Sequence, residues 1–518
     1  MRVTQPLQRN LQQIPDQIAT VDGARRHTWA RLVERIARLA GGLRQLGVTP
    51  GDRVAIVALN SDRYLEVFFA VPWAGGIIVP VNYRWSAPEI AYGLNDSGTK
   101  VLFVDREFWS LVPELRSQVE HELKIVCVDA ELDGRDATHD GLVENSKPIE
   151  EYPNDSDAVS GIFYTGGTTG RAKGVMLTHA NHVTNTLQFV TMVGALPDTI
   201  YLHAAPTFHI ADAQYIYLTT HIAGRHIFMP RFDPAACAQA LQDHGVTDTI
   251  LVPSMIQMLL EQPGFEKFDL TNFKRLFYGA SPMPEPLAVE LGKKLPWVKA
   301  FHLYGQTEAA PLLTALPSRY HTSVGPDAGR LRSCGCALPA VDLKIVDEDG
   351  KEVPRGKVGE IVARGPNIMK GYWGHDDLTA ETLRCGWLHT GDVAHMDEGG
   401  FVFISDRLKD MIISGGENVY STEVENAMYQ HPDVGQCAVI GVPDEKWGER
   451  VHAVVVPAEG TSPNAKDLMA HCRKLIADFK CPRSISFRED PLPLSGAGKV
   501  LKTELRKPFW KGAERQVN

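Results

Sequence analysis

The residues best suited to chemistry lie between positions 164 and 174, where the sequence reads YTGGTTGRAKG. Its four glycines allow the backbone to turn tightly and bring N–H groups close to an anion. Three threonine hydroxyls add neutral donors, and Arg171 and Lys173 add positive charge. This combination suits a polyphosphate, although a polar hairpin could share the composition. No G-x-x-x-x-G-K-[ST] pattern occurs here, so the segment is not a Walker A loop.

The order of these residues resembles the phosphate-binding signature of the adenylate-forming (AMP-binding) superfamily. This superfamily includes acyl-CoA synthetases, firefly-type luciferases and peptide adenylation domains. Its usual form is YTSGTTGxPKG, so Gly166 replaces a serine and Ala172 replaces a proline. We expect these departures to alter loop ordering, not to abolish activity. The resemblance implies that ATP contacts Thr165, Gly166, Gly167, Thr168, Thr169, Gly170 and Lys173, with Thr165 also near Mg²⁺.

Two further segments resemble family motifs near the nucleotide. In YGQTE at 304–308, the resemblance implies that Thr307 contacts phosphate and that Glu308 helps to hold Mg²⁺. A carboxylate is a sensible ligand because Mg²⁺ prefers oxygen donors. The segment FYGAS at 277–281 would line the adenine and acyl pockets. The implied nucleotide contacts here are Gly279, Ala280, Ser281, Tyr304, Gly305, Gln306 and Thr307.

Later segments follow in the family's order. WLHTGD at 387–392 implies that Asp392 accepts hydrogen bonds from the ribose hydroxyls. In DRLKD at 406–410, Arg407 would contact the nucleotide and Lys409 would be the hinge of a rotating C-terminal domain. The next segment, SGGENVY at 414–420, would bring Gly415 and Gly416 towards the pantetheine of CoA.

Near the end of the chain, PLPLSGAGKV at 491–500 resembles the loop that carries the family's adenylation lysine, here Lys499. The implied reaction has two steps. A carboxylic acid first attacks the α-phosphorus of ATP, and Lys499 offsets the charge of the two anionic reactants. CoA then takes the acyl group from AMP after the C-terminal domain has rotated. The predicted activity is an ATP-dependent acid–CoA ligase, with ATP, Mg²⁺ and CoA required.

The segment PTFHIAD at 206–212 bears on the choice of acid. It resembles the acyl-CoA synthetase motif that places a histidine, here His209, beside the acyl pocket and in a catalytic role. Peptide adenylation domains have an aspartate at this position, which argues against α-amino acids. The sequence favours a fatty acid. A hydroxycinnamate or other aryl acid, a carrier-protein acceptor and a non-enzymatic nucleotide binder remain the alternatives.

Composition limits the other classes of function. The 518 residues have a formal net charge of −10, which argues against a general nucleic-acid binder. The uncharged run 67–81 falls short of the ~20 residues that span a bilayer, so no integral membrane segment is expected. With no signal-peptide pattern and few cysteines, we expect a cytoplasmic enzyme whose partners are small molecules. The oligomeric state stays open, a homodimer included.

These motifs need a scaffold of alternating strands and helices. Apolar runs at 52–59, 100–105 and 124–128 predict buried strands, and SAPE at 86–89 predicts a capped helix start. The run 67–81 predicts a helix end and a strand. Arg35, Arg38 and Arg44 are expected on a solvated helix face.

The pattern changes after about residue 320. We predict an α/β N-terminal AMP-binding domain over 1–405, made of two α/β subdomains with a β-barrel part at about 320–405. A small mobile α+β domain over 406–518 is expected to follow, with its hinge near Lys409.

Overall fold

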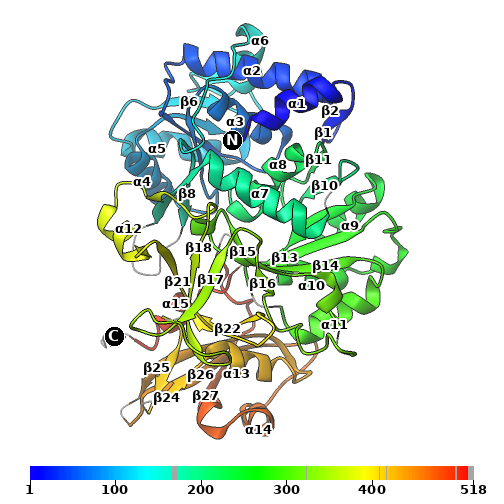
Figure 1. Ribbon diagram of the computed structural model, residues 1–518, viewed down its shortest axis with the longest axis vertical. Helices are drawn as coiled ribbons and strands as arrows, with labels where there is room; N and C mark the ends of the chain where they lie inside the picture. The colour runs from blue at the N-terminus through cyan, green and yellow to red at the C-terminus, as the bar shows by residue number, and fades with distance from the viewer. Residues whose placement is uncertain are drawn as a thin grey trace.

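The computed structural model contains two large α/β sheets, a smaller antiparallel sheet and a fourth sheet in the C-terminal part of the chain (Figure 1). It describes residues 1–165, 172–194, 196–281, 283–322, 324–407, 409–415, 417–444, 446–495 and 499–510. The predicted α/β fold class, with an additional antiparallel sheet and a small C-terminal α+β unit, is confirmed.

The first sheet has eight strands, and its central strands are parallel and buried. In β3, four of five residues are buried, as expected for a strand covered by helices on both faces. The strands lie in the order β19 (Gly371–Tyr372), β9 (Lys173–Thr178), β8 (Val159–Thr165), β4 (Ile77–Pro80), β3 (Arg53–Val57), β5 (Thr99–Val104), β6 (Lys124–Cys127) and β7 (Ala137–Thr138).

The second sheet has nine strands and contains both N-terminal strands of the chain. Its order is β16 (Cys336–Ala337), β15 (Leu312–Leu316), β14 (Lys299–Gly305), β13 (Arg275–Gly279), β12 (Asp248–Leu251), β10 (Ile200–His203), β11 (Arg225–Phe228), β1 (Ile18–Asp22) and β2 (Arg25–Thr28). From β1 to β14 the paired strands run parallel, and β15 and β16 are antiparallel additions at one edge.

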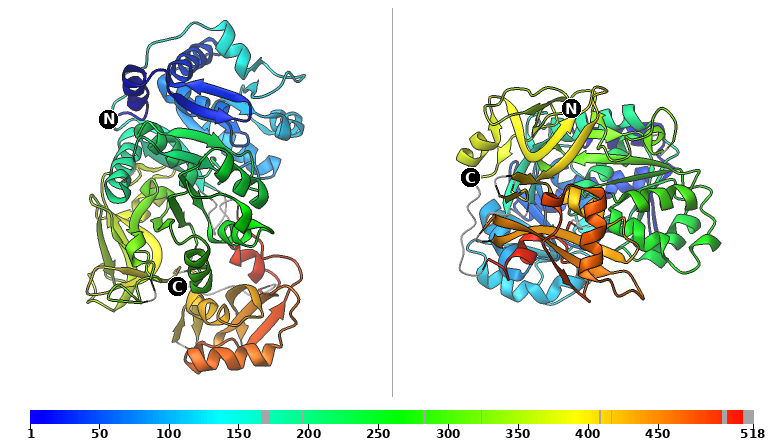
Figure 2. Two further views of the ribbon diagram at one scale, coloured as in Figure 1. Left: turned by 90° about the vertical axis from the view of Figure 1, so that its right-hand side faces the viewer. Right: turned by 90° about the horizontal axis from the view of Figure 1, so that it is seen from below.

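The third sheet is antiparallel, and the fourth forms the core of the C-terminal unit. The third contains β17 (Asp342–Val346), β18 (Val358–Arg364), β21 (Trp387–Met396), β20 (Leu383–Arg384) and β22 (Val402–Arg407). The fourth contains β24 (Glu417–Val419), β23 (Ile412–Ser414), β26 (Gly448–Pro457), β25 (Val434–Asp444) and β27 (Ser484–Phe487). Figure 2 shows the C-terminal unit, in orange to red, packed at one end of the molecule.

Helices separate the strands and cover the sheets. In the N-terminal half they are α1 (Gln5–Gln13), α2 (Trp29–Gln45), α3 (Asp62–Trp73), α4 (Ala87–Ser97), α5 (Val112–Gln118), α6 (His139–Asn145), α7 (His179–Val193), α8 (Ile210–His221) and α9 (Pro234–Asp243). The later ones are α10 (Pro253–Leu260), α11 (Glu285–Lys294), α12 (Asp376–Thr382), α13 (Ser421–Met428), α14 (Ala465–Leu475) and α15 (Lys502–Arg506). The predicted start of α4 is confirmed, because Ser86 and Glu89 form its capping box.

Two expectations need correction. Arg35 is not on a solvated face: it is buried, with its Nε 2.6 Å from Glu66 Oε1, because α3 packs against α2. The antiparallel part is also not continuous over 320–405. Cys336–Ala337 joins the second sheet, and Gly371–Tyr372 joins the first by pairing with β9.

Candidate active site

The first feature of the site is a buried carboxylate, Asp392, between two partners. The hydroxyl of Tyr304 donates to Asp392 Oδ2 at 2.8 Å, and Arg407 Nε lies 3.0 Å from Asp392 Oδ1. Strand geometry explains the second contact, because Asp392 on β21 is directly opposite Arg407 on β22. Tyr304 is on β14, so the second and third sheets meet at this carboxylate.

A second carboxylate, Glu308, lies one turn after β14. The hydroxyl of Tyr372 donates to Glu308 Oε1 at 2.8 Å, and Lys173 Nζ is 5.6 Å from the centre of the Tyr372 ring. Burial raises the pKa of Tyr372, and Glu308 adds to this effect, so the phenol remains a donor. Tyr372 therefore links the predicted metal ligand to the end of the phosphate loop.

The sequence analysis did not find Tyr372. Only the pairing of β19 with β9, where Tyr372 lies opposite Val175, brings this side chain to Glu308. The two residues are 64 positions apart, and nothing in their spacing indicates the contact.

The ends of β13 and β14 approach other backbone very closely. A Cβ on Gly279 would lie 2.1 Å from the carbonyl oxygen of Leu303, and one on Gly305 would lie 1.9 Å from that of Pro311. Ala280 has a φ of 67°, a conformation that non-glycine residues rarely adopt and that is common at functional sites. Ser281 follows at the same strand end.

The segment after β14 is fixed by its backbone. Gln306 donates its N–H to the carbonyl of Pro311 at 2.8 Å, and the Thr307 side chain is buried beside Glu308. The predicted nucleotide contacts Tyr304, Gly305, Gln306 and Thr307 therefore lie in one continuous, well-fixed segment.

The phosphate loop lies between two paired strands, as predicted. Thr165 ends β8 and is directly opposite Lys173, the first residue of β9. The predicted contacts Gly166, Gly167, Thr168, Thr169 and Gly170 lie outside the described residues, as does Gly416. Gly415 is described: its φ is 65°, and its N–H donates to the carbonyl of Trp447 at 2.8 Å.

Lys499 comes to this site from the C-terminal unit. Its loop is closed by hydrogen bonds from Ser495 N to Lys499 O at 2.7 Å and from Lys499 N to Ser495 Oγ at 3.1 Å. Burial lowers the pKa of Lys499 to about 8; the positive charge of Arg407 lowers it further, while Asp392 and Glu308 oppose the shift. The charge of Lys499 thus interacts with those of both carboxylates.

Lys409 adds a third positive charge beside Arg407 and Lys499. Burial lowers the pKa of Lys409 to about 8, and the neighbouring Arg407 lowers it further. Cations that share a partly buried site have fewer water molecules to screen them, so they attract an anion strongly. The arrangement can bind a polyphosphate and stabilise negative charge that develops on it.

His209 lies immediately before α8 and caps its first turn. The N–H of Ala211 donates to His209 Nδ1 at 3.2 Å. Burial lowers the pKa of His209 to about 3, with a further contribution from the charge of Lys499. The ring is therefore neutral, and because Nδ1 accepts a hydrogen bond, the proton is on Nε2.

Matches to two family models identify the protein family. The model described as AMP-binding enzyme matches residues 7–373, and the one described as AMP-binding enzyme C-terminal domain matches residues 423–499. The chain belongs to the AMP-binding enzyme family. The predicted superfamily is thereby confirmed.

Relatives of this AMP-binding enzyme act on several acids. It is 41% identical to a feruloyl-CoA synthase of Amycolatopsis sp., over 96% of each chain. It is 36% identical to the fatty acid–[acyl-carrier-protein] ligase ScoC of Streptomyces coeruleorubidus, over 95% of this chain and 93% of the relative. The ATP-bound structure of MatB from Rhodopseudomonas palustris matches with a TM-score of 0.87 at 30% identity, over 99% of each chain. The predicted class, an ATP-dependent acyl-CoA synthetase, is confirmed.

The residues of this AMP-binding enzyme suit a Mg²⁺ ion that arrives with ATP. Across the part of the chain that the structure describes, no group of three or more His, Cys, Asp or Glu side chains could hold a metal. Glu308 nevertheless offers one carboxylate at the phosphate side of the site. One carboxylate together with substrate phosphates is a common arrangement for Mg²⁺. No described helix of the enzyme is long and apolar enough to cross a membrane.

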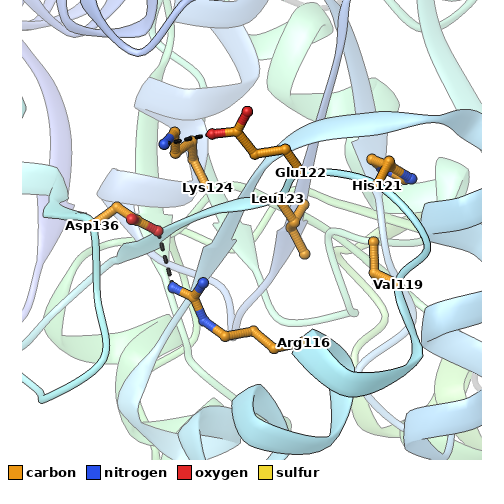
Figure 3. Close-up of a pocket in the computed structure, with 7 residues that line it drawn as sticks. All are labelled: Arg116, Val119, His121, Glu122, Leu123, Lys124 and Asp136. Atoms are coloured by element: carbon orange, nitrogen blue, oxygen red, sulfur yellow. Dashed lines mark hydrogen bonds and ion pairs between the residues drawn. The ribbon is translucent and has the colours of Figure 1, made fainter.

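The cavity drawn in Figure 3 is separate from these residues. It has a volume of about 270 Å³ and lies between α5 and β6. Its charged side chains are already paired: Arg116 Nη2 is 3.0 Å from Asp136 Oδ2, and Lys124 Nζ is 2.7 Å from Glu122 Oε1. None of the predicted site residues lines it.

Proposed function

We propose that this enzyme joins an oxygenated aryl acid of the hydroxycinnamate class to CoA through an acyl-adenylate. The sequence alone favours a fatty acid, and that preference remains the alternative. The electrostatic interaction of Lys499 with Asp392 and Glu308 supports the adenylation step most directly. The feruloyl-CoA synthase at 41% identity supports the choice of an aryl acid.

Two buried polar atoms also support an oxygenated acid. The Tyr215 hydroxyl and Gln188 Nε2 are buried and have no hydrogen-bond partner among the described residues. Tyr215 is on α8, the helix that His209 caps, and its ring lies 5.5 Å from that of Phe277, which precedes Gly279. An alkyl chain could not pair such atoms, and each one left unpaired costs about 1–3 kcal/mol. A phenol or methoxy oxygen could pair them.

In the first step, a substrate carboxylate oxygen attacks the α-phosphorus of ATP, and pyrophosphate leaves with the P–O bonding electrons. Arg407, Lys409 and Lys499 offset the repulsion between the two anionic reactants. Mg²⁺, when bound, supplies further charge neutralisation at the phosphates. Asp392 would accept hydrogen bonds from the ribose hydroxyls.

In the second step, the thiolate of CoA attacks the acyl carbonyl, the bond between the acyl carbon and the phosphate oxygen breaks, and AMP leaves with the bonding electrons. Lys499 and its loop occupy the site during adenylation, so we propose that they withdraw before this step. Rotation of the C-terminal unit about Lys409 would remove them and bring Gly415 closer to the pantetheine.

The relative ScoC supports a second candidate, a fatty acid joined to a carrier protein. Two measurements separate the candidates: which acid gives the fastest pyrophosphate release, and whether AMP release depends on CoA. Faster turnover with octanoate or palmitate than with ferulate or coumarate would overturn the aryl proposal.

Tyr215→Phe tests the proposed pairing. We expect kcat/KM for ferulate to fall about tenfold relative to that for cinnamate, which has no ring oxygens, because one hydrogen bond is lost. Tyr217→Phe is the matched control, since Tyr217 is on the same helix and also has a buried, unpaired hydroxyl but packs against Phe68 and Phe69 of α3. Equal losses with both acids would show that the hydroxyl does not contact the substrate.

A further inference from the structure

The C-terminal unit is attached to the third sheet at the end of β22. Asp406 is buried in this strand and lies opposite Val393 on β21, so its backbone belongs to the third sheet. Its side chain reaches the C-terminal unit: Ser421 donates its backbone N–H to Asp406 Oδ2 at 2.5 Å. Asp406 Oδ1 accepts the N–H of Arg407 at 2.8 Å.

Ser421 is the first residue of α13, so Asp406 places a carboxylate at the N-terminus of that helix. Such a position is electrostatically favourable because the first-turn N–H groups of a helix lack partners within it. A second contact lies beside the first, since the hydroxyl of Thr422 donates to the carbonyl oxygen of Ser405. Both contacts join the end of the third sheet to the first turn of α13.

Lys502 connects this junction to the catalytic loop. It lies three residues after Lys499, with its Nζ 2.7 Å from Glu425 Oε1 and donating to the hydroxyl of Ser421. Its side chain is 13% exposed, and its charge also interacts with Asp406. The position of α13 on Asp406 is thus coupled to the position of the Lys499 loop.

We propose that Asp406, Thr422 and Lys502 form a latch that holds Lys499 in the site for adenylation and opens before acyl transfer. The proposal rests on the two-step function and on a hinge at Lys409. If the unit turns about Lys409, Asp406 and Ser405 stay with β21, whereas Ser421, Thr422 and Lys502 move. The two contacts at α13 must then break, so the three latch residues are positioning residues and need not touch substrate.

The double variant Asp406→Asn/Thr422→Val tests the latch, because each substitution changes the shape of its side chain little. We expect acid-dependent pyrophosphate exchange to fall about tenfold, since a charge-assisted contact and a neutral hydrogen bond are weakened. Thioester formation from supplied acyl-adenylate and CoA should be unchanged or faster. Lys502→Met should act in the same direction. The acid is whichever one the wild type adenylates fastest.

Lys480→Met is the matched control, because Lys480 pairs with Glu423 on the same helix at 2.8 Å but lies outside the latch. Its two half-reactions should keep the wild-type ratio. Thermal melting of each variant separates a loss of folding from a change in arrangement. If both half-reactions fall together in the latch variants, the proposal is wrong.

A distance measurement tests the latch even if the enzyme adenylates none of the acids. Spin labels on the exposed Cys385 and on Glu459→Cys, in a Cys336→Ser background, report the orientation of the C-terminal unit relative to the third sheet. We expect a second distance to gain population in the latch variants and not in Lys480→Met. Identical distance distributions would overturn the latch. A wild type without acid-dependent pyrophosphate release would overturn only the proposed function.

Discussion

The two sides of the active site hold their charged groups differently. Asp392 and Glu308 each accept a hydrogen bond from a tyrosine hydroxyl, from Tyr304 and Tyr372 respectively. These carboxylates and their partners lie on or directly after strands of the three N-terminal sheets. Lys499, in contrast, lies in a loop of the C-terminal unit.

The difference matters because adenylation and acyl transfer make opposite demands on the same space. The adenylate formed in the first step must remain bound for the second, so the residues proposed to hold its ribose benefit from rigid positions. The cation that assists the attack on phosphorus is needed only in the first step. An enzyme can therefore keep Asp392 and Glu308 fixed and withdraw Lys499 between the two steps.

Removing the exchangeable cation should have the largest effect. We expect Lys499→Ala to slow acid-dependent pyrophosphate exchange by about 10²–10³, as is typical for losing one charge-stabilising donor. Thioester formation from preformed acyl-adenylate should fall far less, since the proposed rotation withdraws Lys499 before that step. Equal losses in both half-reactions would contradict the withdrawal of Lys499 before acyl transfer.

The pH dependence of adenylation also tests the role of Lys499. Burial lowers the pKa of Lys499 to about 8, so its ammonium is present below that pH and is lost as the pH rises. We expect kcat/KM of adenylation to fall by up to about tenfold per pH unit above about pH 8, because this parameter reports groups of the free enzyme.

Lysine-to-arginine variants identify the group responsible for this fall. Lys409 has a pKa lowered to about 8 as well, so Lys409→Arg and Lys499→Arg are compared. Arginine keeps its charge at high pH. The alkaline fall should disappear in Lys499→Arg, at a lower maximal rate, and persist in Lys409→Arg. A wild-type profile that stays flat to about pH 9.5 would rule out this role of the Lys499 ammonium.

Loosening the fixed side should have the smallest effect. Tyr372→Phe removes the hydroxyl that bonds Glu308, and we expect adenylation to slow about five- to tenfold, with more Mg²⁺ needed for half-maximal rate. Tyr429→Phe is the control, because it loses a partly buried hydrogen bond to the backbone carbonyl of Cys437 in the C-terminal unit. An unchanged Mg²⁺ requirement in Tyr372→Phe would separate this tyrosine from the metal.

How much of the structure the sequence could predict depends on how far apart in the chain the interacting residues lie. Apolar runs predicted β3, β5 and β6, because a strand that is buried on both faces consists of consecutive apolar residues. The capping box at Ser86 is equally local. The nucleotide motifs were found by resemblance, and the structure brings several of them together around Asp392, although their roles are still predictions.

The contacts that were missed depend on pairing across long separations. Tyr372 reaches Glu308 only because β19 leaves the antiparallel sheet and pairs with β9. Arg35 is buried because Glu66, 31 residues away, offers a carboxylate inside the helix packing. Charged residues on helices are usually exposed, and only the position of Glu66 in the fold shows that Arg35 is buried.

The hydrogen bond from Ala211 to His209 has a consequence for acyl transfer. With Nδ1 already accepting and Nε2 already protonated, this ring has no free lone pair with which to act as a general base. It can only donate, for example to the carbonyl oxygen as negative charge grows there. The sulfhydryl hydrogen of the incoming acceptor must leave by another route, so the rate of the second half-reaction should track the fraction of acceptor already ionised in solution.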